Sequence, residues 1–261
     1  MYNTILVTRE DRVVTVTLNR PERLNAVNGE MISELLNAID AIKRDEDAGV
    51  VVLTGTGRGF CAGADVSGGE LSVPSPLSHW DYLRDRVHRL TLELWRLEKP
   101  VIAAVNGVAA AYGLTLCLLS DIRIVAESAR FTDSAVKLAL LADEGGSYLL
   151  PRTIGLEQAS RLMYTSEIID APEALRIGLV GQVVPDDQLM TEARDLAGRI
   201  ALGPSVTLRL TKRAIRRHME MSLETTLEDV GWLACINNAT DDAREGITAF
   251  REKRSPVFTG Q

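Results

Sequence analysis

Short apolar runs rich in β-branched residues recur along much of the chain, and each has the length of a strand. Residues 5–8 and Val13–Leu18 are joined across polar residues 10–12, which predicts a β-hairpin. Residues 50–54 form an almost continuous apolar run, which is typical of a strand covered on both faces. Further strands are predicted at residues 122–125 and 180–184.

Segments with helical periodicity separate these strands. Asn28 is suited to cap a helix that runs to about Lys43, and a second helix is predicted over residues 81–97. The apolar stripe of the first helix consists of Met31, Leu35, Ile39 and Ile42. Residues 67–78 have the Gly, Ser and Pro content of a mobile surface loop, which serves either as a lid over a site or only as a linker.

The last part of the chain has only helical patterns. Gly203 and Pro204 mark its start, so residues 1–203 are predicted as a core domain and residues 204–261 as a helical region. Its first helix is expected to bury Leu208, Ile215 and Met219. The opposite, solvated side is expected to carry Arg209, Lys212, Arg213, Arg216 and Arg217. The whole order of strands and helices predicts an α/β fold.

The nearly uncharged stretch from Pro100 to Asp121 is the most informative part of the sequence. Val101–Val105 has the pattern of a buried strand, Asn106 and Gly107 are turn residues, and a helix is expected from Gly113. The length approaches the roughly 20 residues of a membrane span, but the turn in its middle argues against one. A strand, a small-residue turn and a helix start leave backbone N–H groups unpaired, as a thioester oxyanion requires.

A second turn of small residues follows the strand at residues 50–54. It has the sequence Gly-Phe-Cys-Ala-Gly-Ala-Asp over residues 59–65. Alone, such a turn usually means only close packing of the backbone. Paired with the turn after residue 105, about forty residues further on, it becomes a more specific signal.

Composition limits the classes of function. The net charge of −7 argues against a broad surface for nucleic acid or anionic membrane. Cys61, Cys117 and Cys235 are scattered, which indicates free thiols in a reducing cytoplasm. No signal peptide is apparent, and the three histidines are not spaced like metal ligands, so no metal site is expected.

These motifs resemble the crotonase (enoyl-CoA hydratase/isomerase) superfamily. The resemblance rests on the two turns and on Leu-Asn-Arg-Pro-Glu-Arg-Leu-Asn-Ala at residues 18–26. It continues through Ser-Asp-Ile-Arg at 120–123, Leu-Pro-Arg-Thr-Ile-Gly at 150–155 and Glu-Lys-Arg-Ser-Pro-Val-Phe at 252–258. It implies a spiral of ββα units, a C-terminal helical region that forms trimers or dimers of trimers, and an acyl-CoA thioester substrate with no further cofactor.

The resemblance assigns the oxyanion hole to the backbone N–H groups of Ala64 and Tyr112. Tyr112 departs from the usual glycine, so its ring either reshapes the cavity or points away. The two glutamates of the family's hydratases match Thr115 and Ala135, and neither of these can act as a general base.

Asp143 matches the position of the single catalytic acid in the family's Δ3,Δ2-enoyl-CoA isomerases. Leucines nearby, at positions 138, 140, 141 and 149, are expected to raise its pKa. The alternative is that Asp143 only caps the next helix. Glu144 is expected to be a capping residue or a neighbour that tunes Asp143.

The same matching gives residues for the CoA moiety: Arg23, Leu24, Ala62, Asp65, Phe250 and Lys253. The predicted function is double-bond isomerisation of an enoyl-CoA with Asp143 as base. Two alternatives stay open: hydration of a 2-enoyl-CoA by Asp143 and Glu144, and an acyl-CoA-binding protein without catalysis.

Overall fold

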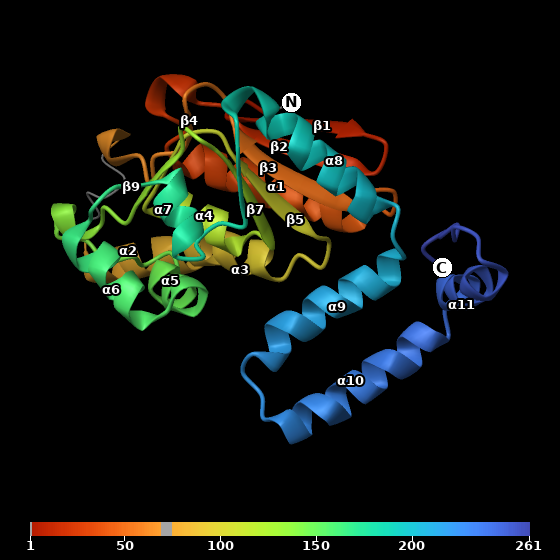
Figure 1. Ribbon diagram of the computed structural model, residues 1–261. Helices are drawn as coiled ribbons and strands as arrows, with labels where there is room; N and C mark the ends of the chain where they lie inside the picture. The colour runs from red at the N-terminus through yellow and green to blue at the C-terminus, as the bar shows by residue number, and fades with distance from the viewer. Residues whose placement is uncertain (1, 69–74) are drawn as a thin grey trace.

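The computed structural model describes residues 2–68 and 75–261, and within these ranges the strands form two sheets (Figure 1). The first sheet has the order β1-β2-β3-β5-β7-β10 and the second has the order β4-β6-β8-β9. The strands of the first sheet are β1 (Ile5–Glu10), β2 (Val13–Leu18), β3 (Val50–Gly55), β5 (Val101–Val105), β7 (Ile122–Ala126) and β10 (Gln182–Val184). Those of the second are β4 (Gly59–Cys61), β6 (Val108–Ala110), β8 (Arg130–Thr132) and β9 (Ile169–Asp170).

Pairs of strands are followed by helices in a repeating order. β3, β5 and β7 each pass directly into a strand of the second sheet, namely β4, β6 and β8, before the chain returns through helices. The α-helices are α1 (Gly29–Arg44), α2 (Pro76–Tyr82), α3 (Arg89–Trp95), α4 (Tyr112–Leu119), α5 (Gly146–Ile154), α6 (Leu156–Thr165), α7 (Ala171–Arg176), α8 (Leu189–Ala201), α9 (Ser205–His218), α10 (Leu223–Asn238) and α11 (Asp241–Glu252). This repetition confirms the predicted α/β spiral of ββα units.

The middle of the first sheet is buried on both faces, which explains the continuous apolar pattern of β3. Val50 and Val52 belong to a cluster with Leu189, Ala193 and Ala197 of α8. The alternate residues of β3, Val51 and Leu53, face the main core on the other side of the sheet, which also contains the apolar stripe of α1.

Most predicted elements are confirmed. β1 and β2 pair antiparallel with Glu10 opposite Val13, and the Asn28 side chain accepts a hydrogen bond from the Met31 N–H at 2.9 Å, as an N-cap should. The structure differs from the helix predicted over residues 81–97. Helical structure begins earlier, at Pro76, and it contains a π-helical stretch, Leu83–His88, before α3. The predicted loop at 67–78 falls partly on residues 69–74, which lie outside the described residues.

The prediction for the first C-terminal helix is wrong about which side is buried. In α9, Ile215 and Met219 are exposed, whereas the side chains of Lys212 and Arg216 are only 7% and 12% exposed. Both cations bind Asp121, with Lys212 Nζ 2.6 Å from Oδ2 and Arg216 Nη2 2.7 Å from Oδ1. The same carboxylate accepts the Val101 N–H at 2.7 Å. The charged residues therefore attach α9 to the core at the start of β5.

Substitution Asp121→Asn is expected to lower the free energy of unfolding by about 3 kcal/mol, because it leaves two largely buried cations without their anion. Urea unfolding of the variant and the parent measures this difference. Asp40→Asn is the control, since its ion pair with Arg44 is largely exposed and its loss should cost at most about 0.5 kcal/mol. Equal stability of the Asp121 variant and the parent would contradict this assignment.

Helices α10 and α11 extend away from the two sheets (Figure 1). α10 carries exposed large apolar residues, namely Leu223, Leu227, Trp232 and Ile236. Cys61 and Cys117 are buried free thiols, and Cys235 is an exposed one. Among the described residues, no helix is both long and apolar enough to cross a membrane.

Candidate active site

The two small-residue turns lie side by side because they follow neighbouring parallel strands. β4 pairs with β6, with Gly59 opposite Val108 and Cys61 opposite Ala109. β6 lies in a segment that the sequence analysis treated only as a turn, so the sequence did not predict this pairing. Since the carboxyl ends of parallel strands meet at one edge, the turn at Ala64 and the start of α4 at Tyr112 lie close together.

Backbone packing between these turns leaves no room for a side chain at Gly113 and little at Gly63. A Cβ on Gly113 would lie 2.0 Å from the Cys61 carbonyl oxygen, so only glycine allows α4 to approach β4 this closely. Gly63 has a φ of +105°, and a Cβ there would lie 3.1 Å from the Ala110 carbonyl oxygen. Ala111 has φ 45° and ψ −116°, a strained conformation that costs on the order of 1–3 kcal/mol and directs the chain into α4.

Two backbone donors are unpartnered at this junction. Among the residues that the structure describes, the N–H groups of Ala64 and Tyr112 have no hydrogen-bond acceptor. The neighbouring Asp65 N–H donates to the Val27 carbonyl and the Ala111 N–H donates to the Thr132 carbonyl, so the turn is held while these two donors stay free. This is the arrangement that stabilises an oxyanion.

A cavity of about 220 Å³ opens beside the two donors. Ala64 and Tyr112 line it together with Asp143 and Glu144, so the structure brings the residues predicted for catalysis, and Glu144 beside them, to one place. Most of the remaining wall is apolar and includes Val27, Ile32, Leu83, Val87, Leu138, Leu140 and Leu141. An apolar cavity with a few convergent polar groups is typical of a small-molecule binding site.

Asp143 lies at the open side of the cavity, where it stays accessible to solvent. It does not cap α5, because the N-cap residue of that helix is Gly145, so the capping alternative is wrong. Partial burial raises the pKa of Asp143 above its ordinary value, and the positive charges of His79 and His88 lower it in part. His88 Nε2 lies 2.9 Å from the Asp143 backbone carbonyl oxygen and so fixes this part of the loop.

Glu144 is buried deeper than Asp143, with a relative exposure of 6%. Thr115 Oγ1 donates a hydrogen bond of 3.1 Å to Glu144 Oε1. The pKa of Glu144 is raised to about 7, mainly by burial and to a smaller extent by the charges of Asp143 and Asp133, although the hydrogen bond from Thr115 lowers it in part. Glu144 does not cap α5 either, so of its two expected roles the capping one is wrong, and the expectation that it is a neighbour that tunes Asp143 stays a prediction.

The Tyr112 side chain forms part of the cavity wall. Its hydroxyl donates to the Val87 carbonyl at 3.2 Å, so the ring extends toward the π-helical stretch. Burial raises the pKa of the phenol, which keeps it protonated. The ring is therefore held by this contact, and its effect on the shape of the cavity stays a prediction.

Two features of the site were missed by the sequence analysis. His79 of α2 lines the cavity, and its Nδ1 is buried without a hydrogen-bond partner among the described residues. The contact between Thr115 and Glu144 joins residues from α4 and from the loop before α5. Neither feature has a local sequence signal, since each depends on how distant segments pack.

The residues predicted to hold CoA fall into two groups. Ala62 and Asp65 line the cavity, and the Ala62 N–H donates to the Leu24 carbonyl at 2.9 Å, so the turn with Leu24 and the exposed Arg23 lies next to them. Hydrogen bonds from Ser67 and Arg20 lower the pKa of Asp65 to about 2.

The second group lies on a different part of the chain. Phe250 and Lys253 are exposed at the end of α11, which extends away from the sheets, and neither residue lines the cavity (Figure 1). One chain therefore does not bring the two groups together.

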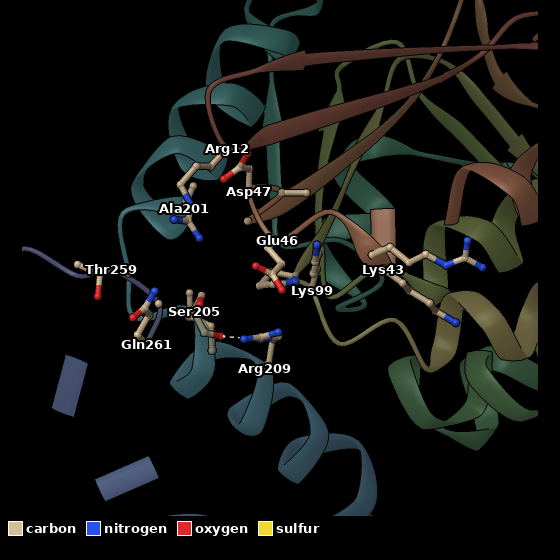
Figure 2. Close-up of a pocket in the computed structure, with 17 residues that line it drawn as sticks. Arg12, Lys43, Glu46, Asp47, Lys99, Ala201, Ser205, Arg209, Thr259 and Gln261 are labelled. Atoms are coloured by element: carbon tan, nitrogen blue, oxygen red, sulfur yellow. Dashed lines mark hydrogen bonds between the residues drawn. The ribbon is translucent and has the colours of Figure 1, made fainter. Parts of the chain in front are cut away.

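A larger hollow of about 720 Å³ lies elsewhere, between the start of α9, the turn after α1 and the C-terminal tail (Figure 2). Its wall mixes basic residues such as Arg12, Lys99 and Arg209 with Glu46 and Asp47. None of the residues predicted for catalysis or CoA binding lines it. Size alone therefore does not identify the site.

Comparison with known proteins agrees with the geometry of the smaller cavity. The model of the enoyl-CoA hydratase/isomerase family matches residues 8–261. The chain belongs to this family. A relative within it, the 1,2-epoxyphenylacetyl-CoA isomerase of Escherichia coli, is 40% identical over the full length of both chains.

Other family members are named as hydratases. The short-chain-enoyl-CoA hydratase of Clostridium acetobutylicum is 39% identical over 97% of this chain and 96% of its own. The crystal structure of an enoyl-CoA hydratase from Bacillus anthracis superposes with a TM-score of 0.94 at 34% identity, over 99% of this chain and 100% of that one. The protein is thus an enzyme of the family, and the fold is confirmed as crotonase-like.

Proposed function

We propose that the protein moves the double bond of a 3-enoyl-CoA to the 2 position. The observation that supports this most strongly is the single cavity in which two unpartnered N–H groups lie with Asp143, while Thr115 and Ala135 occupy the positions of the hydratase glutamates. The name of the Escherichia coli relative, an isomerase of a CoA thioester, supports the same class of reaction.

The reaction follows from the positions of these groups. The N–H groups of Ala64 and Tyr112 bind the thioester oxygen and so make the C2 hydrogen acidic. The Asp143 carboxylate removes a C2 proton, and the electron pair delocalises into a dienolate whose negative oxygen the same donors stabilise. A proton added at C4 completes the shift, so no oxidant, reductant or water is consumed. The chemistry needs no cofactor beyond the CoA carried by the substrate.

Product analysis with two substrates tests this function. The purified protein is given 3-hexenoyl-CoA and, in parallel, 2-hexenoyl-CoA, and products are followed by chromatography and mass. We expect the 3-enoyl ester to become the 2-enoyl ester at unchanged mass. Binding of both esters without reaction would favour a non-catalytic acyl-CoA-binding protein. Since the Escherichia coli relative is named for a ring-bearing acyl group, a 3-enoyl thioester with a ring belongs in the same panel.

Hydration of a 2-enoyl-CoA is the second candidate. The observation that favours it is the buried Glu144 carboxyl beside Thr115, which supplies a second acid where α4 itself carries none. Gain of one water by 2-hexenoyl-CoA would establish this reaction in place of isomerisation.

The pH dependence of the isomerisation is expected to report Asp143. As a base it must be ionised, so kcat/KM should rise with pH through a pKa above that of an ordinary aspartate. His79→Gln removes a charge that lowers this pKa, so the rising limb should move to higher pH. His218→Gln is the control, because His218 contacts Asp229 in the C-terminal helices. An unchanged limb in the His79 variant would contradict the assignment.

We expect the chain to form a trimer or a dimer of trimers, since α10 presents large apolar side chains to solvent. Phe250 and Lys253 would then contact CoA bound to a neighbouring subunit. Light scattering coupled to size exclusion measures the mass of the assembly.

A further inference from the structure

Two acidic residues that are adjacent in the sequence, Asp143 and Glu144, line the cavity, and their surroundings differ. Asp143 is accessible at the open side of the cavity, whereas Glu144 is almost completely buried and still lines it. The loop that carries them is held by hydrogen bonds to consecutive carbonyls, from His88 to that of Asp143 and from the Thr91 hydroxyl to that of Glu144 at 2.8 Å. The backbone that carries the two carboxyl groups is therefore held in place, and the two groups differ in exposure.

The Glu144 side chain has a hydrogen-bond partner in Thr115, and Gly146 leaves space for this contact. Thr115 on the first turns of α4 donates to Oε1, and the helix that carries it begins with Tyr112, one of the two oxyanion donors. A Cβ at Gly146 would lie 3.1 Å from Thr115 Oγ1 and 3.6 Å from Glu144 Oε1, so the glycine leaves room for this contact. The carboxyl group thus lies on the side of the cavity where α4 begins.

The surroundings also separate the protonation states of the two acids. Burial raises the pKa of Glu144 to about 7, so near neutral pH a large fraction of this carboxyl carries a proton. Asp143 is more accessible, and the positive charges of His79 and His88 favour its ionised form. Titratable groups whose environments separate their pKa values are typical of an acid and base pair.

We propose that Glu144 is a second catalytic acid, which protonates C4 of the dienolate after Asp143 has removed the proton from C2. This rests on the proposed isomerisation. Asp143 gains the C2 proton, Glu144 loses its own to C4, and the double bond moves from C3–C4 to C2–C3. After the product leaves, Asp143 loses its proton to solvent and Glu144 regains one from solvent, which restores both groups. Thr115 is a positioning residue that holds Glu144 at the substrate.

Transfer of deuterium distinguishes one acid from two. The full-length protein is given 3-hexenoyl-CoA with both C2 hydrogens replaced by deuterium, in ordinary water. If Asp143 alone moves the proton, part of the label reappears at C4 and the product keeps both deuterium atoms. If Glu144 delivers the C4 proton, the product keeps only the deuterium atom that remains on C2. The mass of the 2-hexenoyl-CoA formed early in the reaction gives the ratio directly.

We expect almost all of the product that the wild type forms to contain a single deuterium atom. Glu144→Gln should lower kcat by about 10²-fold, because general acid catalysis contributes 10²–10⁴-fold, and should raise the share of doubly labelled product at least severalfold. Thr115→Val keeps the side-chain shape and removes the hydrogen bond that holds Glu144. Its kcat and its share of doubly labelled product should lie between those of the wild type and of the Glu144 variant. This variant still tests the proposal if the Glu144 variant folds poorly. Glu157→Gln, an exposed substitution on α6, should change neither quantity.

Each outcome decides the assignment. A wild-type product that keeps both labels would show a single acid and overturn the role of Glu144, and so would equal label ratios in the wild type and the Glu144 and Thr115 variants. In both cases the proposed isomerisation would stand. Wild-type protein that converts no 3-enoyl-CoA would overturn the proposed function itself, and the inference with it.

Discussion

Asp143→Asn is expected to lower the isomerisation rate by about 10³-fold while leaving acyl-CoA binding intact. The amide keeps the shape of the side chain at the open side of the cavity but cannot accept the C2 proton, and a positioned general base typically contributes 10²–10⁴-fold. The N–H groups of Ala64 and Tyr112 would still bind the thioester oxygen. Initial rates with 3-hexenoyl-CoA and calorimetric titration with the unreactive hexanoyl-CoA measure the two quantities separately.

Asp187→Asn is the matched control, since Asp187 is exposed in the turn before α8 and does not line the cavity. Its rate and its affinity should equal those of the parent. Isomerisation by the Asp143 variant at more than about a tenth of the parental rate would show that another group is the base.

Gly113→Ala is expected to damage both stability and activity. The added methyl group would be placed 2.0 Å from the Cys61 carbonyl oxygen and 2.7 Å from its carbon, and both belong to backbone that cannot rotate away. The end of β4 and the start of α4 must therefore separate, which moves the Ala64 and Tyr112 donors apart. We expect the free energy of unfolding to fall by about 3 kcal/mol, as overpacking of a core does. We expect kcat to fall by about 10²–10³-fold, as loss of one oxyanion donor does.

Gly198→Ala tests whether these losses are specific to the approach of the two turns. Gly198 lies inside α8, and a Cβ there would meet no atom within 4 Å. Because alanine favours a helix over glycine, this variant should be more stable by up to about 1 kcal/mol and fully active. Urea unfolding and initial rates of both variants provide the comparison. A Gly113 variant as stable and as active as the Gly198 variant would contradict the close approach.

The sequence pattern predicts the long elements well because their signals are local. The periodicity of α1, its Asn28 cap and the apolar run of β3 each lie within one segment. β6 was missed since three small residues between two turns have no pattern of their own, and their strand geometry comes from pairing with β4 and β8. Short strands of this kind are determined by tertiary contacts.

The burial of Lys212 and Arg216 shows a second limit of predicting structure from the sequence pattern. A rule that directs charged side chains to solvent fails when a carboxylate from a distant segment is available, and Asp121 is 95 residues away from Arg216 in the chain. The side of α9 that packs on the core follows from that carboxylate and could not be inferred from helical spacing alone.

At the site, the resemblance to a known family placed Ala64, Tyr112 and Asp143 at one cavity, and the structure agrees with that placement. It did not indicate the contact of Thr115 with Glu144 or the position of His79, because these arise from the packing of α4, the loop before α5 and α2. The roles of all these residues stay predictions.

The crystal structure of the Asp143→Asn variant with 3-hexenoyl-CoA bound is the measurement that tests the central claim most directly. The account predicts the thioester oxygen about 3 Å from the N–H groups of both Ala64 and Tyr112, with C2 and C4 of the acyl chain facing the side chain at position 143. A thioester oxygen bound away from these donors, or an acyl chain outside the cavity that Asp143 and Glu144 line, would contradict it.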